Sequence, residues 1–136
     1  MARAGKNRSR GFTLIELMIV ISIILILVSV ALPAYNLSIL RARESVLRQN
    51  LFTLRSVISQ YTLDKQKAPQ SLDDLVSAGY LKQLPVDPTS GRNDTWVADQ
   101  EEDTTMSIDA TDAGGIVDVH TGSQAVGSDG TAYNTW

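Results

Sequence analysis

A continuous apolar run near the amino terminus constrains this chain more than any other feature of its sequence. Residues 17–32 are apolar except for Ser22 and Ser29, and the run can be extended upstream to Phe12. Roughly 20 residues of apolar helix are enough to cross a bilayer. Cationic residues precede the run without a balancing acid: Arg3, Lys6, Arg8 and Arg10. The positive-inside rule therefore predicts a cytoplasmic amino terminus and export of everything after about Tyr35.

Two simpler interpretations of this segment are a cleaved secretory signal and a generic signal anchor. Ser29-Val30-Ala31 offers a small-x-small cleavage site. However, the apolar run is long for a signal peptide, and a helical pattern continues beyond Pro33. Glu16 argues against a generic anchor, because a carboxylate in an apolar helix costs roughly 2.5–3.5 kcal/mol at the bilayer centre and usually has a function. A role beyond anchoring is expected.

The residues around Glu16 resemble a known export signal. The run G-F-T-L-I-E-L-M-I-V-I, from Gly11 to Ile21, is similar to the class III signal of type IV pilins and type II secretion pseudopilins. The resemblance implies that a prepilin peptidase cleaves after Gly11 and methylates the new amino group of Phe12. It also implies that residues 1–11 are a leader absent from the mature protein.

Glu16 has a physical role that is consistent with this processing. Cleavage would leave a free amine on Phe12, four residues before Glu16. Side-by-side packing of identical helices brings the amine of one copy to the carboxylate of another. Such pairing offsets the desolvation cost that each charge bears in an isolated chain, so it favours assembly and sets the axial register. Phe12 and Glu16 are therefore predicted assembly residues, together with Pro33, which is expected to kink or locally melt the helix.

Beyond Pro33, an amphipathic pattern predicts that the helix continues to about Leu63. Its apolar face is formed by Leu40, Leu47, Leu51, Leu54, Ile58 and Tyr61. Arg41, Arg43, Arg48 and Arg55 fall off that face. A free coiled coil is the alternative, but Glu44 interrupts the heptad. The pattern favours a stalk whose second half packs on a small globular head.

The rest of the chain predicts short elements. Ser71 is the expected N-cap of a helix ending at Gly79, with Asp74 in a capping-box position. Three strands of a small antiparallel sheet are expected at 94–98, 104–109 and 115–120. The acidic run 99–103 is expected to be a hairpin tip. The predicted fold class is α+β, in which a long N-terminal hydrophobic helix packs on a small antiparallel sheet. The predicted organisation is a leader (1–11), a transmembrane and assembly helix (12–35) and a periplasmic head (36–136).

The head resembles one branch of the same family. The pattern P-x-S-L-x-x-L-V-x-x-G-Y-L-x-x-L-P-x-D-P at 69–88, and the ending from Asp118 to Trp136, are similar to G-type major pseudopilins. Residues 89–92 depart from the pattern, because many relatives have Trp-Gly there. The resemblance implies a structural subunit of a type II secretion pseudopilus, which polymerises through its N-terminal helix and drives protein export across the outer membrane.

The same resemblance implies the partners and the location of the chain. The expected partners are further copies in a helical filament, the prepilin peptidase, the inner-membrane assembly platform and minor pseudopilins. The chain is expected in the inner membrane and then in a periplasmic or extracellular filament. Two alternatives stay open: a type IV pilin for adhesion or motility, and a signal-anchored binding protein that never polymerises and keeps its leader.

Composition argues against several other classes of protein. Eight basic and fifteen acidic side chains follow Gly11, a balance that does not suggest nucleic-acid binding. The absence of Cys excludes disulfides, cysteine zinc sites and thiol nucleophiles. His120 is the only histidine, and no Ser-His-Asp ordering, phosphate loop or paired active-site carboxylate stands out. The chain is therefore predicted not to be an enzyme.

The resemblance also suggests a metal ion. Many type IV pilins tie down the carboxyl-terminal region with a disulfide, whereas G-type pseudopilins are similar to each other in using a bound calcium ion. The loop 121–131 offers the hard oxygen ligands that suit Ca²⁺. Asp129 is the first candidate ligand, with Asp118, Ser123 and Ser128 beside it. The alternative is a Gly/Asp turn that binds no ion.

Overall fold

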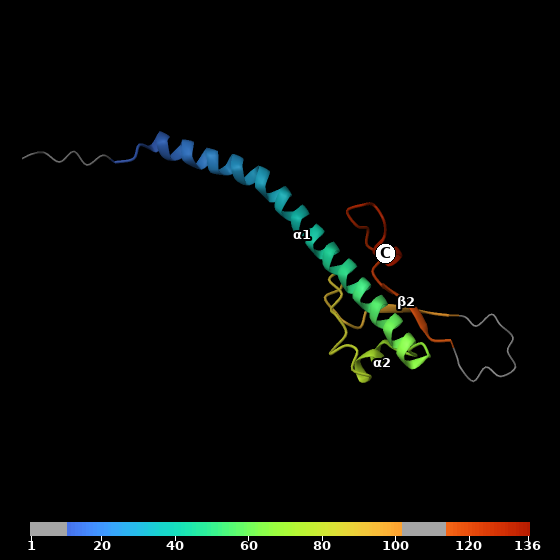
Figure 1. Cartoon of the computed structure of the whole chain (residues 1–136). Helices are drawn as coiled ribbons and strands as arrows, with labels where there is room; N and C mark the ends of the chain where they lie inside the picture. The colour runs from blue at the N-terminus through green and yellow to red at the C-terminus, as the bar shows by residue number, and fades with distance from the viewer. Residues whose placement is uncertain (1–10, 102–113) are drawn as a thin grey trace, which may run out of the picture. The chain divides into compact units, whose positions relative to one another are not determined.

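A computed structural model describes residues 11–101 and 114–136 of the chain. In order along the chain, these residues form α1 (Leu14–Lys65), α2 (Leu72–Ser77), β1 (Trp96–Gln100), β2 (Ile116–Thr121) and the 3₁₀ turn η1 (Tyr133–Thr135) (Figure 1). The chain divides into two compact units. The first unit ends at Ser38, and the second, which we call the head, runs from Ile39 to Trp136. The predicted α+β class is confirmed.

Helix α1 is α-helical on both sides of Pro33. Proline removes a single backbone donor, and the neighbouring residues Ala31, Leu32 and Ala34 are good helix formers. The hydroxyl groups of Ser22, Ser29 and Ser38 each donate to a backbone carbonyl three or four residues earlier, at 2.7–3.0 Å. These bonds keep the hydroxyl groups paired within the helix. The helix is continuous at Pro33, so the predicted local melting is wrong, whereas the predicted kink stays a prediction.

One face of α1 forms the core of the head. Leu47, Leu51, Leu54 and Ile58 are buried, and they recur at the helical period that the sequence predicts. Glu44 is buried on the same side of the helix. The other buried apolar members of this core are Leu75, Trp96, Ile116, Val119 and Tyr133. Each fully buried aliphatic side chain contributes about 1.5–3 kcal/mol, so apolar burial holds the head on the helix.

Local capping defines the short helix α2. Ser71 is its N-cap, and the backbone N–H of Ser71 donates to Oδ2 of Asp74 at 3.0 Å in a capping box. This hydrogen bond is the main cause of the lowered pKa of Asp74. Gly79 lies just beyond the helix with φ of 83°, a conformation that favours glycine, and its N–H donates to the carbonyl of Val76 at 3.1 Å. The predicted start and stop of this helix are confirmed.

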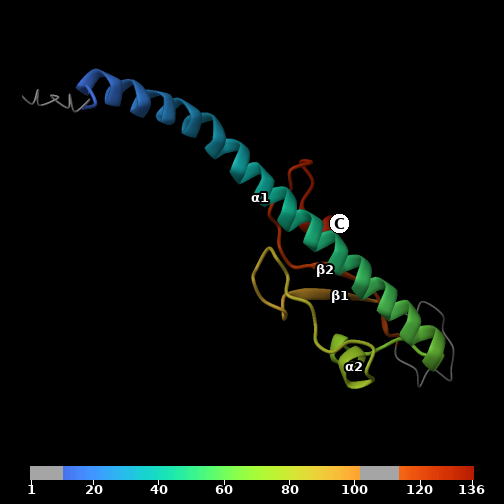
Figure 2. The same cartoon turned by 60° about the vertical axis from the view of Figure 1, so that its left-hand side comes forward.

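Strands β1 and β2 pair in an antiparallel sheet, which has two strands in the described part of the chain. Trp96 lies opposite Thr121 and Ala98 lies opposite Val119. The sheet lies beside the second half of α1 (Figure 2). Trp96, Ile116 and Val119 point into the core from this sheet. The predicted small antiparallel sheet is confirmed.

The acidic half of the chain differs in part from the prediction. β1 extends to Gln100, so Asp99 and Gln100 pair with β2 and do not belong to a hairpin tip. Asp99 is accommodated there because its carboxylate lies 3.0 Å from Nδ1 of His120 on the neighbouring strand. The rest of the predicted tip, beyond Glu101, and the predicted strand at 104–109 lie outside the described residues.

A close backbone approach connects the end of α1 to the sheet. The N–H of Ile116 donates to the carbonyl of Pro69 at 2.7 Å. A Cβ atom on Gly115 would lie 2.5 Å from Cβ of Ala68, closer than real side chains approach. Glycine is therefore required at position 115, because only a residue without a side chain lets the two backbones meet there.

Candidate functional site

The amino-terminal end of α1 carries the residues predicted to act in processing and assembly. Gly11 and Phe12 are exposed and precede the first helical turn. Thr13 caps the helix, since its Oγ1 accepts a hydrogen bond from the N–H of Glu16 at 3.3 Å. Glu16 lies in the first turn, where a carboxylate interacts favourably with the helix dipole. The structure thus places Phe12 and Glu16 at the same exposed end of the helix.

The apolar side chains that follow have no protein cover in the single chain. Between Phe12 and Leu32, the large apolar residues are 44–82% exposed. This part of α1 is long and apolar enough to cross a membrane. Soluble monomers rarely expose contiguous apolar surface of this extent. Lipid or protein outside the single chain must therefore cover it.

A second polar feature, which the sequence analysis did not single out, lies in the head. The side chain of Glu44 is 5% exposed although it belongs to the stalk helix. Its Oε1 accepts hydrogen bonds from the N–H of Ser128 at 2.6 Å and from the hydroxyl of Tyr133 at 3.0 Å. Its Oε2 accepts a third bond, from Oγ of Ser128, at 2.5 Å. The buried carboxylate is therefore fully used in holding residues near the carboxyl terminus.

Two arginines of α1 contact the same part of the chain. Arg55 donates to Oδ1 of Asp118 at 2.6 Å, to the carbonyl of Val119 at 3.1 Å and to the backbone oxygen of Trp136 at 2.7 Å. Arg48 lies 3.4 Å from the carboxylate of Asp129, and its guanidinium lies 4.2 Å from the centre of the Trp136 ring. The sequence pattern correctly placed both arginines off the apolar face, but not their partners.

Asp87 is a second fully buried carboxylate. Its Oδ1 accepts hydrogen bonds from the N–H and the hydroxyl of Thr89, at 2.8 and 2.6 Å. Its Oδ2 accepts hydrogen bonds from the hydroxyl groups of Thr121 and Thr95. Asp87 thus ties the loop before β1 to the end of β2. Thr89 belongs to the stretch in which the sequence departs from the G-type pattern.

Comparison with known proteins identifies the family. Residues 6–32 match the Prokaryotic N-terminal methylation motif. The Type II secretion system core protein G of Klebsiella pneumoniae is 34% identical over 98 residues, which cover 60% of this chain and 70% of that protein. The chain belongs to the type IV pilin and pseudopilin family.

Two further relatives match a larger and a smaller share of the chain. The Type IV major fimbrial protein FimA of Dichelobacter nodosus is 33% identical over 114 residues, which cover 82% of this chain and 71% of the relative. The Competence protein ComGC of Halalkalibacterium halodurans is 36% identical over 76 residues, or 56% and 74% of the two chains. No solved structure shows a significant match. The apolar helix and the methylation motif fit a membrane-anchored pilin or pseudopilin. Cleavage after Gly11 and methylation of Phe12 stay predictions.

The four residues predicted to bind calcium all have protein partners in this pilin-like head. Asp118 pairs with Arg55, and Asp129 accepts hydrogen bonds from the N–H and hydroxyl of Thr131. Oγ of Ser128 donates to Glu44, and Oγ of Ser123 lies 3.4 Å from the N–H of Ala125. In the part of the chain that the structure describes, no three His, Asp or Glu residues are grouped as metal ligands. As placed, this donor set does not fit a calcium ion, because the two carboxylates are each committed to an arginine. Calcium binding itself stays a prediction.

The pKa of Glu44 leads to a testable pH dependence. The hydrogen bond from the Ser128 hydroxyl is the largest cause of a pKa below the ordinary value of 4.5, and it outweighs the opposing effect of burial. A carboxyl group with a lowered folded pKa stabilises the fold above its unfolded pKa, and this contribution is lost as the pH falls through the folded pKa.

We therefore expect the stability difference between wild type and Glu44→Gln to be largest near neutral pH and to shrink below pH 4.5. Urea unfolding of both proteins, followed by circular dichroism over a pH series, measures this difference. A difference that stays constant from neutral pH to well below 4.5 would show that the ionised carboxylate is not what stabilises the head.

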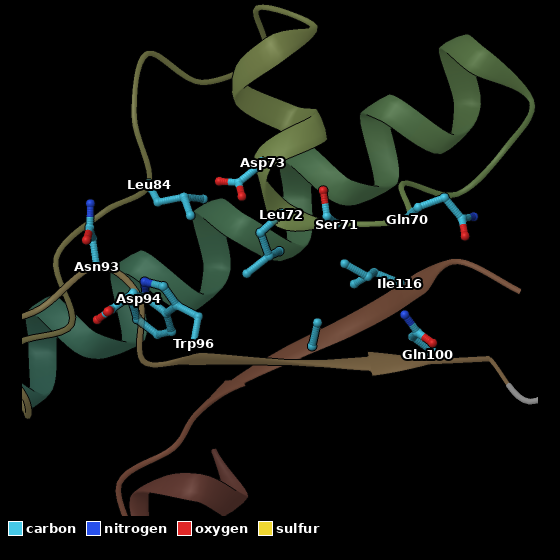
Figure 3. A pocket seen from close by; sticks show the side chains of 11 residues that line it. Gln70, Ser71, Leu72, Asp73, Leu84, Asn93, Asp94, Trp96, Gln100 and Ile116 are labelled. Atoms are coloured by element: carbon cyan, nitrogen blue, oxygen red, sulfur yellow. The ribbon is translucent and has the colours of Figure 1, made fainter.

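The head also has an open groove. It has a volume of about 430 Å³ and lies between α2 and the sheet (Figure 3). Leu72, Leu84 and Ile116 supply apolar walls, and Asp73 and Asp94 lie at the rim. Asp94 is paired with Arg92. The prediction that the chain is not an enzyme is consistent with its family.

Proposed function

We propose that this chain is a structural subunit of a type II secretion pseudopilus, which polymerises through its N-terminal helix to drive protein export across the outer membrane. The observation that carries the proposal is the uncovered apolar surface from Phe12 to Leu32, with Glu16 at its start. A subunit of a helical fibre buries such a surface against other copies. Similarity to Type II secretion system core protein G supports the choice of system.

The proposal assigns a role to each part of the chain. Residues 1–11 are a leader removed by a prepilin peptidase, which methylates Phe12. Residues 12–35 cross the inner membrane, with the amino terminus in the cytoplasm and residues 36–136 in the periplasm. Further copies, an inner-membrane assembly platform and minor pseudopilins are the partners of the assembling subunit.

Leaving the membrane for a fibre requires that contacts with other copies of the helix replace the contacts of the apolar segment with lipid. Lipid tails are as apolar as leucine, so helix association in a bilayer depends on packing and on polar pairs. The amine of Phe12 and the carboxylate of Glu16 are the polar pair available at this end of the chain. Their pairing between neighbouring copies therefore adds specificity that apolar packing alone does not give.

Leader removal is the step that separates this proposal from a signal-anchored binding protein. We expect mass spectrometry of the wild-type chain, expressed with a prepilin peptidase, to find methylated Phe12 as its first residue. Gly11→Val is expected to keep the leader, because a β-branched side chain replaces the residue that allows the closest backbone approach. Gly5→Val makes the same change within the leader and should be processed normally.

Either of two results would contradict the proposal. A wild-type chain that keeps residues 1–11 in peptidase-containing cells would support the non-polymerising anchor. Fibres that form as readily from Gly11→Val as from wild type would show that processing is not required for assembly.

A type IV pilin for adhesion or motility is the second candidate. The match to FimA, which covers 82% of this chain, favours it. Deletion of the gene distinguishes the two functions: a pseudopilin is needed for release of exported proteins, whereas a pilin is needed for surface fibres and movement. Complementation with the intact gene provides the control.

A further inference from the structure

Three side chains on one flank of α1 reach the last part of the chain. Glu44, Arg48 and Arg55 are separated by four and seven residues, so they share one side of the helix. We call them the polar row. We call residues 123–136 the C-terminal segment. The row contacts this segment at Ser128, Asp129, Tyr133 and Trp136, and Arg55 also holds the adjoining strand β2 at Asp118.

The C-terminal segment has few apolar contacts of its own. Tyr133 is buried in the core, and Trp136 packs edge-to-face on Tyr133 with ring centres 5.0 Å apart. Most residues from 124 to 131 are exposed. A single isolated bridge joins Val126 to Ala132, and Asp129 closes a turn by accepting two bonds from Thr131. Such a segment needs further fixed contacts to stay ordered on the helix.

Glu44 supplies the contact that water cannot easily replace. It is buried and accepts three hydrogen bonds, two from Ser128 and one from Tyr133. Hydrogen bonds to a charged group are about twice as strong as neutral ones. If the segment detached, the carboxylate would lose all three donors at once. The buried charge therefore favours the docked segment strongly.

The arginines hold the carboxylates that a bound calcium ion would need. Arg55 occupies Asp118 at 2.6 Å, and Arg48 lies against Asp129 at 3.4 Å. A cation placed between these carboxylates would face two guanidinium groups. The charges of Asp118 and Asp129 are thus already balanced by side chains of α1.

We propose that the polar row is a metal-independent latch, which holds the C-terminal segment on α1 with Glu44 as its buried member. The latch does the work that a disulfide or a bound ion does in a small exported domain. The head keeps its fold whether or not calcium is present.

The test uses the full-length chain in detergent micelles. Thermal unfolding is measured with excess calcium chloride and with excess EGTA. Hydrogen exchange reports the Ser128 amide, which donates to Glu44. Glu44→Gln removes the charge and places an amide N–H₂ among the donors. Glu101→Gln makes the same chemical change at an exposed carboxylate and is the matched control.

For the latch, EGTA should leave Tm unchanged. Glu44→Gln should lower Tm by at least about 5 °C, in line with the size of this domain. It should also speed exchange of the Ser128 amide at least about tenfold. Glu101→Gln should change neither. If Glu44→Gln does not fold, Ser128→Ala removes one donor from an exposed loop and should give the same effects in weaker form.

Two results would overturn the proposal. The first is a fall in Tm with EGTA that calcium restores, which would show that an ion holds the segment. The second is unchanged exchange of the Ser128 amide in Glu44→Gln, which would show that the carboxylate does not hold it. Because neither measurement uses fibres, both results are independent of the proposed role in a pseudopilus.

Discussion

Glu16→Ala is expected to abolish fibre assembly while leaving the head folded. In the proposed fibre, the Glu16 carboxylate pairs with the amine of Phe12 on a neighbouring copy. Removing one partner leaves the amine buried and unpaired, which costs about 3–5 kcal/mol for a buried ion pair. Because each 1.4 kcal/mol is a factor of ten, fibre yield should fall on the order of 100-fold or more.

Electron microscopy and sedimentation of sheared fibres measure this loss. Ser22→Ala is the control, because it removes a polar group from the same apolar segment. The Ser22 hydroxyl donates to the carbonyl of Met18 within its own helix. Circular dichroism of the detergent-solubilised variants should show equal folding of the head. Normal amounts of Glu16→Ala fibre with unchanged helical parameters would rule out the role of Glu16 in assembly and register.

Leu54→Ala is expected to cause the largest loss of head stability among single core changes. Leu54 is fully buried in the middle of the apolar face of α1. Leucine-to-alanine changes at such sites cost about 2–5 kcal/mol, because they remove buried surface and leave a cavity. Against a total of roughly 5–15 kcal/mol, this change removes a large share of the stability. Tm should fall by on the order of 15 °C.

Phe52→Ala is a demanding control for this prediction. It removes a larger side chain only two residues away on the same helix, but Phe52 is 68% exposed. Its effect on the free energy of unfolding should stay within about 0.5 kcal/mol. Urea unfolding followed by circular dichroism compares the two. Equal losses at both positions would mean that the buried face of α1 has been assigned incorrectly.

The parts of the head that depend on local rules were predictable. Spacing alone predicts a buried helix face at Leu47, Leu51, Leu54 and Ile58, and each of these residues is buried. Ser71 and Gly79 mark the ends of α2 because capping depends on a few neighbouring residues. The antiparallel sheet was also predicted, although β1 lies about two residues later than expected.

The interactions of the head that span the whole chain were not predictable in the same way. The heptad pattern identifies Glu44 only as an interruption, and its partners Ser128 and Tyr133 lie 84 and 89 residues away. One signal was present: Glu44 lies between Leu40 and Leu47 at helical spacing, which places it on the buried face. A carboxylate at such a position needs donors, but periodicity does not reveal which residues supply them.

The candidate calcium ligands show a similar limit. Asp118 and Asp129 have the right chemistry for a hard cation, and their spacing does not exclude one. Whether a carboxylate faces an ion or an arginine depends on which helix side chains pack beside it. The sequence pattern places Arg48 and Arg55 off the apolar stripe but does not show that they pair with acids, as they do in the fold.

The distance along the chain between Glu44 and its partners affects when the head can finish folding. The hydrogen bonds at Ser128 and Tyr133 close loops of 84 and 89 residues, and closing such loops is entropically costly and slow. In the proposed topology, α1 leaves the cytoplasm before Ser128 and Tyr133, so Glu44 lacks these donors until the end of the chain follows. In that topology, the head completes its fold only after its last residues have left the cytoplasm.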